Sequence, residues 1–218
     1  VDVVKSGAKL GEIMRSHPDF FEELPCRPDG WTPDLGVPWL VVGNCMGFTA
    51  KPSLLGRSSE VENDPGYSIL FYAVLSRGAI RKLATGGSPA LRLWQQLVRI
   101  RQSRRDGNPL KMIATCDNLA ALGVPGMMKQ YNGKPALATD SVAVITDTGH
   151  EGVVEIDIDL RKWSFMFQKC YTSVQAKLAL GAFNVGFCVE GRSPATLPEE
   201  ILLAFGLDKL DVSQARVL

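Results

Sequence analysis

The stretch Val153-Val154-Glu155-Ile156-Asp157-Ile158-Asp159-Leu160 alternates apolar and acidic side chains. Because successive side chains of a strand point to opposite faces, this period of two predicts a β-strand with one dry and one polar face. We expect the acidic side chains to face solvent, at a sheet edge or on an open face. A divalent cation is the alternative for Glu155, Asp157 and Asp159, but no His, Asn or tight glycine loop completes a ligand set, so no metal is assigned.

Directly after this strand the apolar period lengthens, which predicts an amphipathic helix over residues 162–180. Its apolar positions are Trp163, Met166, Phe167, Cys170, Val174 and Leu178. A second helix is predicted over 88–105, where Ser88 can cap the N-terminus and Pro89 can occupy the first turn. A short final helix is predicted over Leu197–Phe205, with Pro198 in its first turn.

Further strands are predicted where apolar runs lie between turn residues. They cover Leu40–Phe48, Tyr67–Leu75, Leu110–Cys116, Ala136–Ala138, Ser141–Thr146 and Phe183–Val189. The nearly continuous apolarity of Tyr67–Leu75 indicates burial on both faces. We therefore expect one α+β domain, residues 38–218, in which a mostly antiparallel sheet packs against two longer amphipathic helices. Residues 1–37 are expected to form a helix, over 4–24, and a proline-rich arm.

Composition excludes several classes of protein. The 218 residues include 45% hydrophobic and 22% charged ones, as in ordinary globular domains, and the net charge of +1 gives no overall attraction to nucleic acid. The longest apolar runs fall far short of the ~20 residues of a spanning helix. Five cysteines without CxxC spacing predict reduced thiols and a cytoplasmic protein, with peripheral attachment to a membrane left open.

No convincing catalytic centre is present in the sequence. The two histidines, His17 and His150, have no nucleophile and orienting partner at recognisable spacing. The stretch from Gly123 to Lys134 is rich in glycine, but its spacing is not that of a phosphate-binding loop. We assign no catalytic residue and no cofactor, and we expect a binding protein.

Two groups of side chains are candidate binding sites. The apolar residues Phe71, Tyr72, Trp163, Met166 and Phe167 lie on a strand and a helix that are expected to face each other, and they predict a cavity for a lipid or another apolar small molecule. Ordinary core packing is the alternative. The basic residues Arg101, Arg104 and Arg105 predict a patch for an anionic membrane surface or phosphate, with a solvated helix end as the alternative.

Five segments in order resemble one family, the carboxy-terminal domain of the plant Enhanced Disease Resistance Two proteins. They are Pro65–Tyr72, Lys111–Ile113, Gly133–Leu137, Glu155–Asp159 (similar to the family's "YlEIDvDI") and Phe187–Leu202, which includes Leu197-Pro198-Glu199-Glu200. The likeness spans about residues 38 to 213, and the family's opening segment is not recognisable in residues 1–36. In plants this domain often follows a pleckstrin-homology domain and a lipid-binding START domain. The resemblance therefore implies lipid or membrane association, and it supplies no catalytic residues.

The favoured function is thus non-catalytic binding of a lipid or other apolar molecule. The first alternative is an interaction or structural subunit, homo-oligomers included, whose proline-rich arm carries Trp31 and Trp39 toward a partner. An enzyme of unrecognised type is the second alternative.

Overall fold

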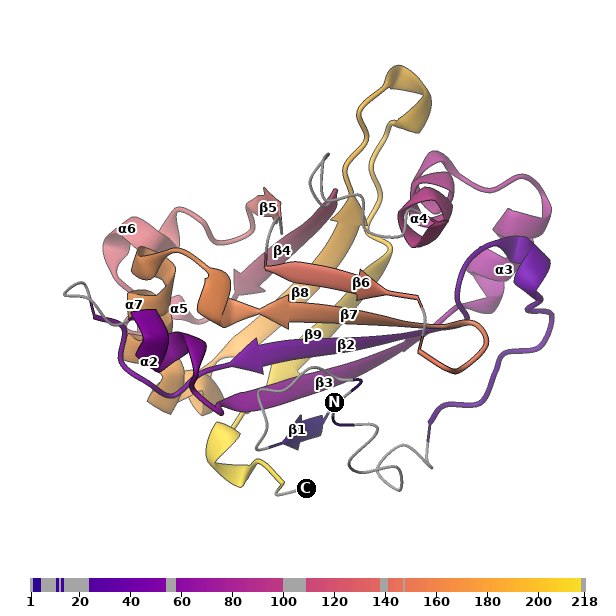
Figure 1. Ribbon diagram of the computed structural model, residues 1–218. Coiled ribbons are helices and arrows are strands. Elements are labelled where there is room, and N and C mark those ends of the chain that lie inside the picture. Colours follow the sequence, from indigo (N-terminus) through magenta and orange to yellow (C-terminus); the bar gives the residue numbers. More distant parts are fainter. Residues whose placement is uncertain are drawn as a thin grey trace.

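Two β-sheets face each other in the computed structural model, and helices close both ends of the space between them (Figure 1). The structure describes residues 2–4, 11, 13, 24–53, 58–99, 109–137, 141–146 and 148–216. The predicted α+β class and the mostly antiparallel pairing are confirmed. The strands divide into two sheets, however, whose apolar inner faces pack against each other.

The first sheet has the strand order β1-β3-β2-β7-β6. These strands are β1 (Asp2–Val4), β3 (Tyr67–Val74), β2 (Leu40–Gly47), β7 (Val153–Asp159) and β6 (Val142–Ile145). All neighbours pair antiparallel except β2 and β7, which run parallel and place Asn44 beside Asp157. The inner face of this sheet carries Phe71, whose ring lies so close over Gly43 that a Cβ there would overlap it.

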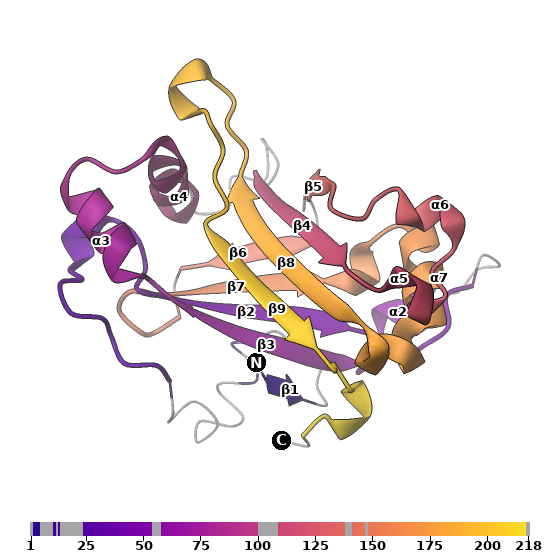
Figure 2. The same ribbon diagram turned by 180° about the vertical axis from the view of Figure 1, so that it is seen from behind.

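The second sheet has the order β5-β4-β8-β9 and is antiparallel throughout. Its strands are β5 (Pro135–Leu137), β4 (Leu110–Cys116), β8 (Ala182–Val189) and β9 (Leu203–Asp208). Seen from behind, β8 and β9 cross the strands of the first sheet at an angle (Figure 2). The apolar core lies between the sheets, where the Phe71 ring contacts those of Phe205 and Phe187 at centroid distances of 4.7 and 5.8 Å.

The helices are short and gather at the two ends of the sheets (Figure 1). At one end lie α3 (Arg77–Ala84) and α4 (Pro89–Arg99), and at the other α2 (Ser58–Glu62), α5 (Leu119–Leu122), α6 (Gly126–Lys129) and α7 (Phe165–Val174). Short 3-10 segments are η2 (Pro33–Leu35), η3 (Leu160–Lys162), η4 (Gln175–Leu180), η5 (Pro194–Thr196) and η6 (Val212–Gln214). The predicted cap of α4 is present, since Ser88 Oγ accepts from the Leu91 backbone N–H at 3.3 Å.

The prediction that the acidic row of β7 faces solvent is wrong. Glu155 and Asp157 are 2% exposed and Asp159 is 8% exposed, because β7 is a central strand and its polar face is covered. The backbone N–H of Gly11 donates to Glu155 Oε1 at 3.4 Å, and the Arg161 guanidinium lies 2.7 Å from Asp159. Buried carboxylates are retained only with such partners.

The predicted final helix, Leu197–Phe205, is also wrong. Residues 197–202 are not helical, the Leu197–Pro198 bond is cis, and Leu203–Asp208 form β9 instead. The Glu199 side chain pairs with Lys111 on β4 rather than with a helix N-terminus. The edge of β8 provides the hydrogen bonds that the segment would otherwise make within a helix.

The two longer helices are only partly as predicted. The segment 162–180 divides into η3, α7 and η4, because Ser164 starts a new cap, with its Oγ accepting from Phe167 N–H at 3.3 Å. The helix from residue 88 is described to Arg99, and its predicted end lies outside the described residues. The predicted helix over 4–24 lies largely outside them as well, with Gly11 and Ile13 described as helical.

Candidate functional site

An apolar cavity of about 160 Å³ lies between the two sheets, at the end that α3 and α4 cover. Its walls are Pro38, Val41, Phe71, Ala73, Val74, Leu75, Ser76, Ala79, Leu91, Trp94, Leu110, Ile156, Phe187, Leu202 and Leu203. No lining residue carries a charge, and Ser76 contributes the one hydroxyl. An anionic or cationic group inside would lose its hydration without gaining a partner, so this space suits only apolar groups.

The alternation of two strands directs aromatic side chains into this space. Phe71 and Ala73 lie two residues apart on β3 and therefore share the inner face, while Phe187 faces them from β8. The Ala73 side chain is small, and the space beside the Phe71 ring is left unfilled. Leu91 and Trp94, three residues apart on one side of α4, form the wall that this helix contributes, here called the roof of the cavity.

The cavity opens to solvent beside the end of β3. Val74 is 41% exposed and Ser76 is exposed, yet both line the cavity and so mark its mouth. Across the mouth lie Leu202 and Leu203, where the chain enters β9. β1 pairs with β3 only at residues 68–70, and β9 is an edge strand, so the two sheets are not joined along this side.

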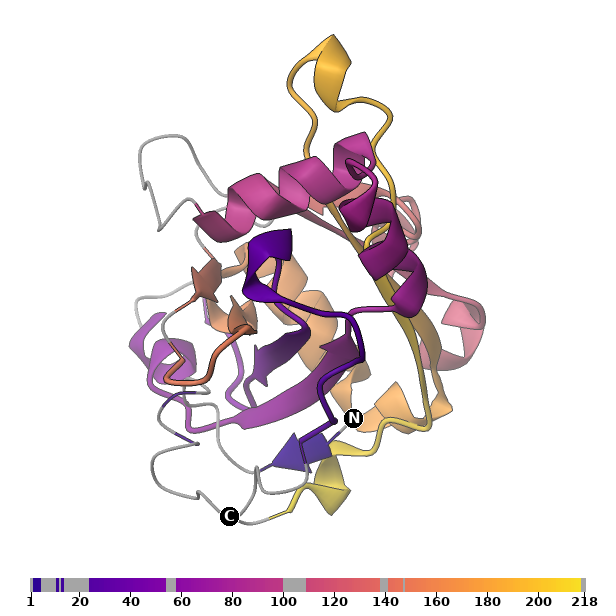
Figure 3. The same cartoon turned by 90° about the vertical axis from the view of Figure 1, so that its right-hand side faces the viewer.

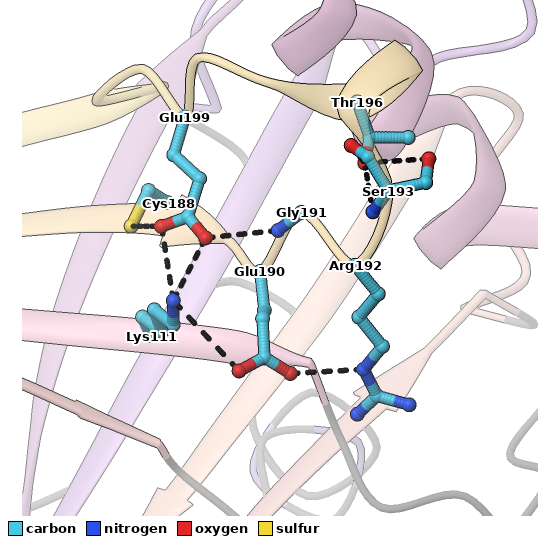
Figure 4. A network of polar contacts seen from close by, with 8 residues as sticks. All are labelled: Lys111, Cys188, Glu190, Gly191, Arg192, Ser193, Thr196 and Glu199. Atoms are coloured by element: carbon cyan, nitrogen blue, oxygen red, sulfur yellow. Dashed lines mark hydrogen bonds and ion pairs between the residues drawn. The ribbon is translucent and has the colours of Figure 1, made fainter.

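A polar network fixes the loop that leads into this rim, here called the β8–β9 loop (residues 190–202) (Figure 4). Lys111 Nζ of β4 lies 2.8 Å from Glu199 Oε1 and 3.8 Å from Glu190 Oε1. The backbone N–H of Gly191 donates to Glu199 Oε1 at 2.9 Å, and Arg192 pairs with Glu190 at 2.9 Å. Glu199 thereby ties the end of the loop, just before Leu202 and Leu203, to the start of the loop and to β4.

Electrostatics within the network favour the charged forms of the pair. The hydrogen bond from Lys111 holds the pKa of Glu199 below its usual range, with smaller help from the Gly191 N–H. The same bond raises the pKa of Lys111. Burial, together with the Glu199 charge, raises the pKa of the Cys188 thiol, whose Sγ lies 3.9 Å from Glu199. Cys188 is therefore a protonated thiol at neutral pH and not an activated nucleophile.

The structure separates the five residues that the sequence suggested as ligand-binding. Phe71 lines the cavity, whereas Tyr72 points to the other face of the first sheet and packs beside Leu40, Val42 and Leu70. Trp163 and Phe167 do come together, with ring centroids 4.3 Å apart, but they pack at the α7 end of the core. Met166 projects outward from α7 and is 48% exposed.

Several residues that line the cavity are not among the binding residues predicted from the sequence. For two of them, the apolar pattern of α4 already indicates an inward-facing position. Leu91 and Trp94 were predicted only as the buried side of that helix. Phe187 and Leu203 are partners in the pairing of β8 with β9, and they share the cavity with Phe71 only because the two sheets pack together, which no local pattern reveals. Arg101, Arg104 and Arg105 lie outside the described residues, so the predicted basic patch stays a prediction.

Other chemistry has little support within the described ranges. Among them no three His, Cys, Asp or Glu side chains are grouped to hold a metal ion, and no helix is both long and apolar enough to cross a bilayer. His150 is exposed in the turn before β7. The five cysteines, all of them described, form no disulfide.

Comparison with known proteins identifies the family. No curated protein and no solved structure matches the chain. The family model described as Protein ENHANCED DISEASE RESISTANCE 2, C-terminal, matches residues 1–211, and thus includes the first 37 residues as well as both sheets and the β8–β9 loop. Because the match covers nearly the whole sequence, the chain belongs to the family of the C-terminal domain of ENHANCED DISEASE RESISTANCE 2.

Proposed function

We propose that this domain binds an apolar group, such as part of the acyl chain of a lipid, in the cavity between its two sheets. One observation carries this function: a charge-free, partly open cavity lies within the apolar core between the sheets. Protein interiors rarely leave such space unfilled, since each void forfeits contacts between its walls. A ligand restores those contacts.

The size of the cavity limits what it can take. Sites for whole small molecules usually measure roughly 300–1,000 Å³, whereas an engineered cavity of roughly 150 Å³ with similar apolar walls accommodates benzene. With about 160 Å³, this cavity suits one ring or the end of a single chain. The remainder of a longer ligand would leave past Val74 and Leu203 at the mouth.

The main alternative, an interaction subunit, is motivated by the two tryptophans of the proline-rich arm, and both of them donate hydrogen bonds within the chain itself. Trp31 in the proline-rich arm is 6% exposed and donates from its indole N–H to the Val37 carbonyl at 2.9 Å. Trp39 donates in the same way to the Glu151 carbonyl at 3.0 Å. Both tryptophans are thus used to hold the arm on its own domain.

A fluorescent polyene fatty acid titrated into the purified chain tests the proposal. Ala79→Leu on α3 adds three carbons at the cavity wall, and we expect it to raise the Kd at least tenfold by filling the space. Ala84→Leu is the matched control, because Ala84 lies exposed on the same helix and does not line the cavity. Equal affinities for wild type and Ala79→Leu, with both folded, would refute binding at this site.

A further inference from the structure

We infer that the outer face of α3 and α4, together with the tip of the β8–β9 loop, docks on an anionic membrane surface. This surface deepens the proposed function, on which it rests, because it would place the mouth of the cavity against the source of a lipid. The partner is a bilayer with acidic headgroups. Charge, exposure and position support this choice.

Charge is strongly segregated around these helices. The whole chain has 24 basic and 23 acidic residues, yet residues 65–105 contain no Asp or Glu and eight Lys or Arg. Those eight are Arg77, Arg81, Lys82, Arg92, Arg99, Arg101, Arg104 and Arg105. A segment that departs so far from the balance of the chain carries a local positive field, which attracts anionic surfaces.

The described basic residues lie on the outward sides of both helices. On α3, Arg77 and Arg81 are one turn apart, Lys82 adjoins them, and all three are exposed. On α4 the exposed side carries Arg92 and Arg99. Because the inward sides of the same helices line the cavity, the positive charge lies on the roof over the proposed binding site.

Neighbouring carboxylates offset only part of this charge. Asp29 lies 3.3 Å from Arg77, but the two side chains are 92% and 76% exposed, so the pair is weak and can exchange for a lipid phosphate. Glu200 accepts from Ser88 Oγ at 3.4 Å beside the start of α4. The Arg92 guanidinium donates to the neutral carbonyls of Gly86 and Gly87 and keeps its net charge.

The β8–β9 loop adds an uncharged tip next to this basic face. It projects beyond α4, and η5 at its tip packs against that helix (Figure 3). Residues 193–198, Ser-Pro-Ala-Thr-Leu-Pro, carry no charge, and Leu197 is 50% exposed. An exposed leucine beside arginines suits the interfacial zone of a bilayer, where apolar contact and attraction to acidic headgroups act together.

The mouth of the cavity adjoins the same face. Ser76 on the rim immediately precedes Arg77, and Leu202 on the opposite rim is the last residue of the β8–β9 loop. A chain drawn from the bilayer would therefore pass between these two segments. The basic residues would hold its headgroup outside the charge-free interior.

Sedimentation with vesicles of phosphatidylcholine, alone or with 30% phosphatidylserine, tests the docking surface at low and high salt. We expect binding only to the acidic vesicles, and we expect salt to weaken it. The variant R77Q/R81Q/K82Q should bind about 100-fold more weakly, at roughly fivefold for each basic residue. Leu197→Ser should also bind more weakly than wild type.

The control variant K162Q/K169Q/K177Q removes the same charge from exposed lysines around α7, at the other end of the molecule. It should bind acidic vesicles within about threefold of wild type, since these lysines would face away from the bilayer. Equal losses in both triple variants would show a mere effect of net charge and overturn the docking surface. Absence of any binding to acidic vesicles by the folded wild type would do so too.

Failure of the docking surface can be told apart from failure of the proposed binding in the cavity. Titration with the fluorescent fatty acid needs no vesicle, so R77Q/R81Q/K82Q should bind that probe nearly as wild type does. If Ala79→Leu alone loses the probe and no protein binds vesicles, the cavity stands and the docking surface falls. If vesicles bind as predicted but the probe never does, the docking surface stands without a lipid site.

Discussion

Lys111 on β4 and Glu199 in the β8–β9 loop form an ion pair, with 2.8 Å between Nζ and Oε1, that crosses from the second sheet to the loop at the mouth of the cavity. Their side chains are 19% and 24% exposed, so solvent screens the pair less than an ordinary surface pair. Glu199 also accepts from Gly191, which joins the two ends of the loop.

Replacing Lys111 with Met should lower the free energy of unfolding by about 2 kcal/mol, because a partly buried carboxylate loses a charged donor. The exposed pair of Arg77 with Asp29 gives a control, and Arg77→Met should change stability by at most about 0.5 kcal/mol. Urea unfolding of the three proteins measures both effects. A Lys111→Met loss no larger than that of the control would contradict a structural role for the pair.

The same pair should make stability depend on pH at both extremes. The lowered pKa of Glu199 means that its contribution is present above the ordinary value of 4.5 and is lost as pH falls through the folded value. The raised pKa of Lys111 means that its contribution is present below 10.5 and is lost as pH rises through the folded value. The difference between wild type and Lys111→Met should therefore be constant near neutrality and shrink at both ends.

A second relationship explains how the first sheet tolerates buried charge. Asn44, fully buried on β2, donates from Nδ2 to Asp157 Oδ1 at 3.0 Å across the parallel pair. Asn44→Asp would set two carboxylates side by side and should cost more than about 3 kcal/mol at pH 7, and less at pH 5, where one of them takes up a proton.

The exposed pair of Asn184 and Asp117, at 3.4 Å, offers the matched change. Asn184→Asp should stay within about 0.5 kcal/mol of wild type at both pH values. Chemical unfolding at the two pH values tests the comparison. Equal small losses in both variants would mean that the polar face of β7 is solvated after all.

The cysteines should differ in reactivity according to burial. Burial, with a contribution from Asp159, raises the pKa of the Cys45 thiol to about 12, while Cys26 is exposed. In the native protein at pH 8 we expect a thiol reagent to modify Cys26 first and Cys45 only on unfolding. Denaturation without reductant should then expose five thiols, and a smaller number would reveal a disulfide.

The basic patch of Arg101, Arg104 and Arg105 stays a prediction of the sequence, and it extends the charge of α4. Changing all three to Glu should abolish sedimentation with acidic vesicles at low salt, since each basic residue contributes about 1 kcal/mol and reversal adds repulsion. Unchanged sedimentation would confine the contact to α3, the described part of α4 and the loop.

Much of the fold follows from local pattern. The strand β3 was predicted because its apolar run is nearly continuous, and the start of α4 because Ser88 and Pro89 suit the first turn. The alternation of residues 153–160 correctly gave a strand. It did not show that Gly11 would lie against the polar face, because period two describes side-chain direction and not what lies opposite.

The remaining differences come from contacts between distant residues. Leu197-Pro198-Glu199-Glu200 has the composition of a helix start, yet Glu199 finds Lys111, 88 residues away, and the chain continues into β9. Phe71 lies on the wall of the cavity between the sheets, whereas Trp163 and Phe167 belong to the other end of the core. Only the pairing of the strands decides which aromatic residues share a space.

Photo-crosslinking tests the central claim, that the cavity between the sheets binds an apolar chain, most directly. A fatty acid with a diazirine at its terminal carbon would be bound to the purified chain, irradiated, and its adducts located by peptide mass spectrometry. We predict adducts on the cavity walls, in the segments that carry Phe71, Trp94 and Leu203, and their loss in Ala79→Leu but not in Ala84→Leu. Adducts confined to surfaces away from these walls, and unchanged in Ala79→Leu, would contradict the claim.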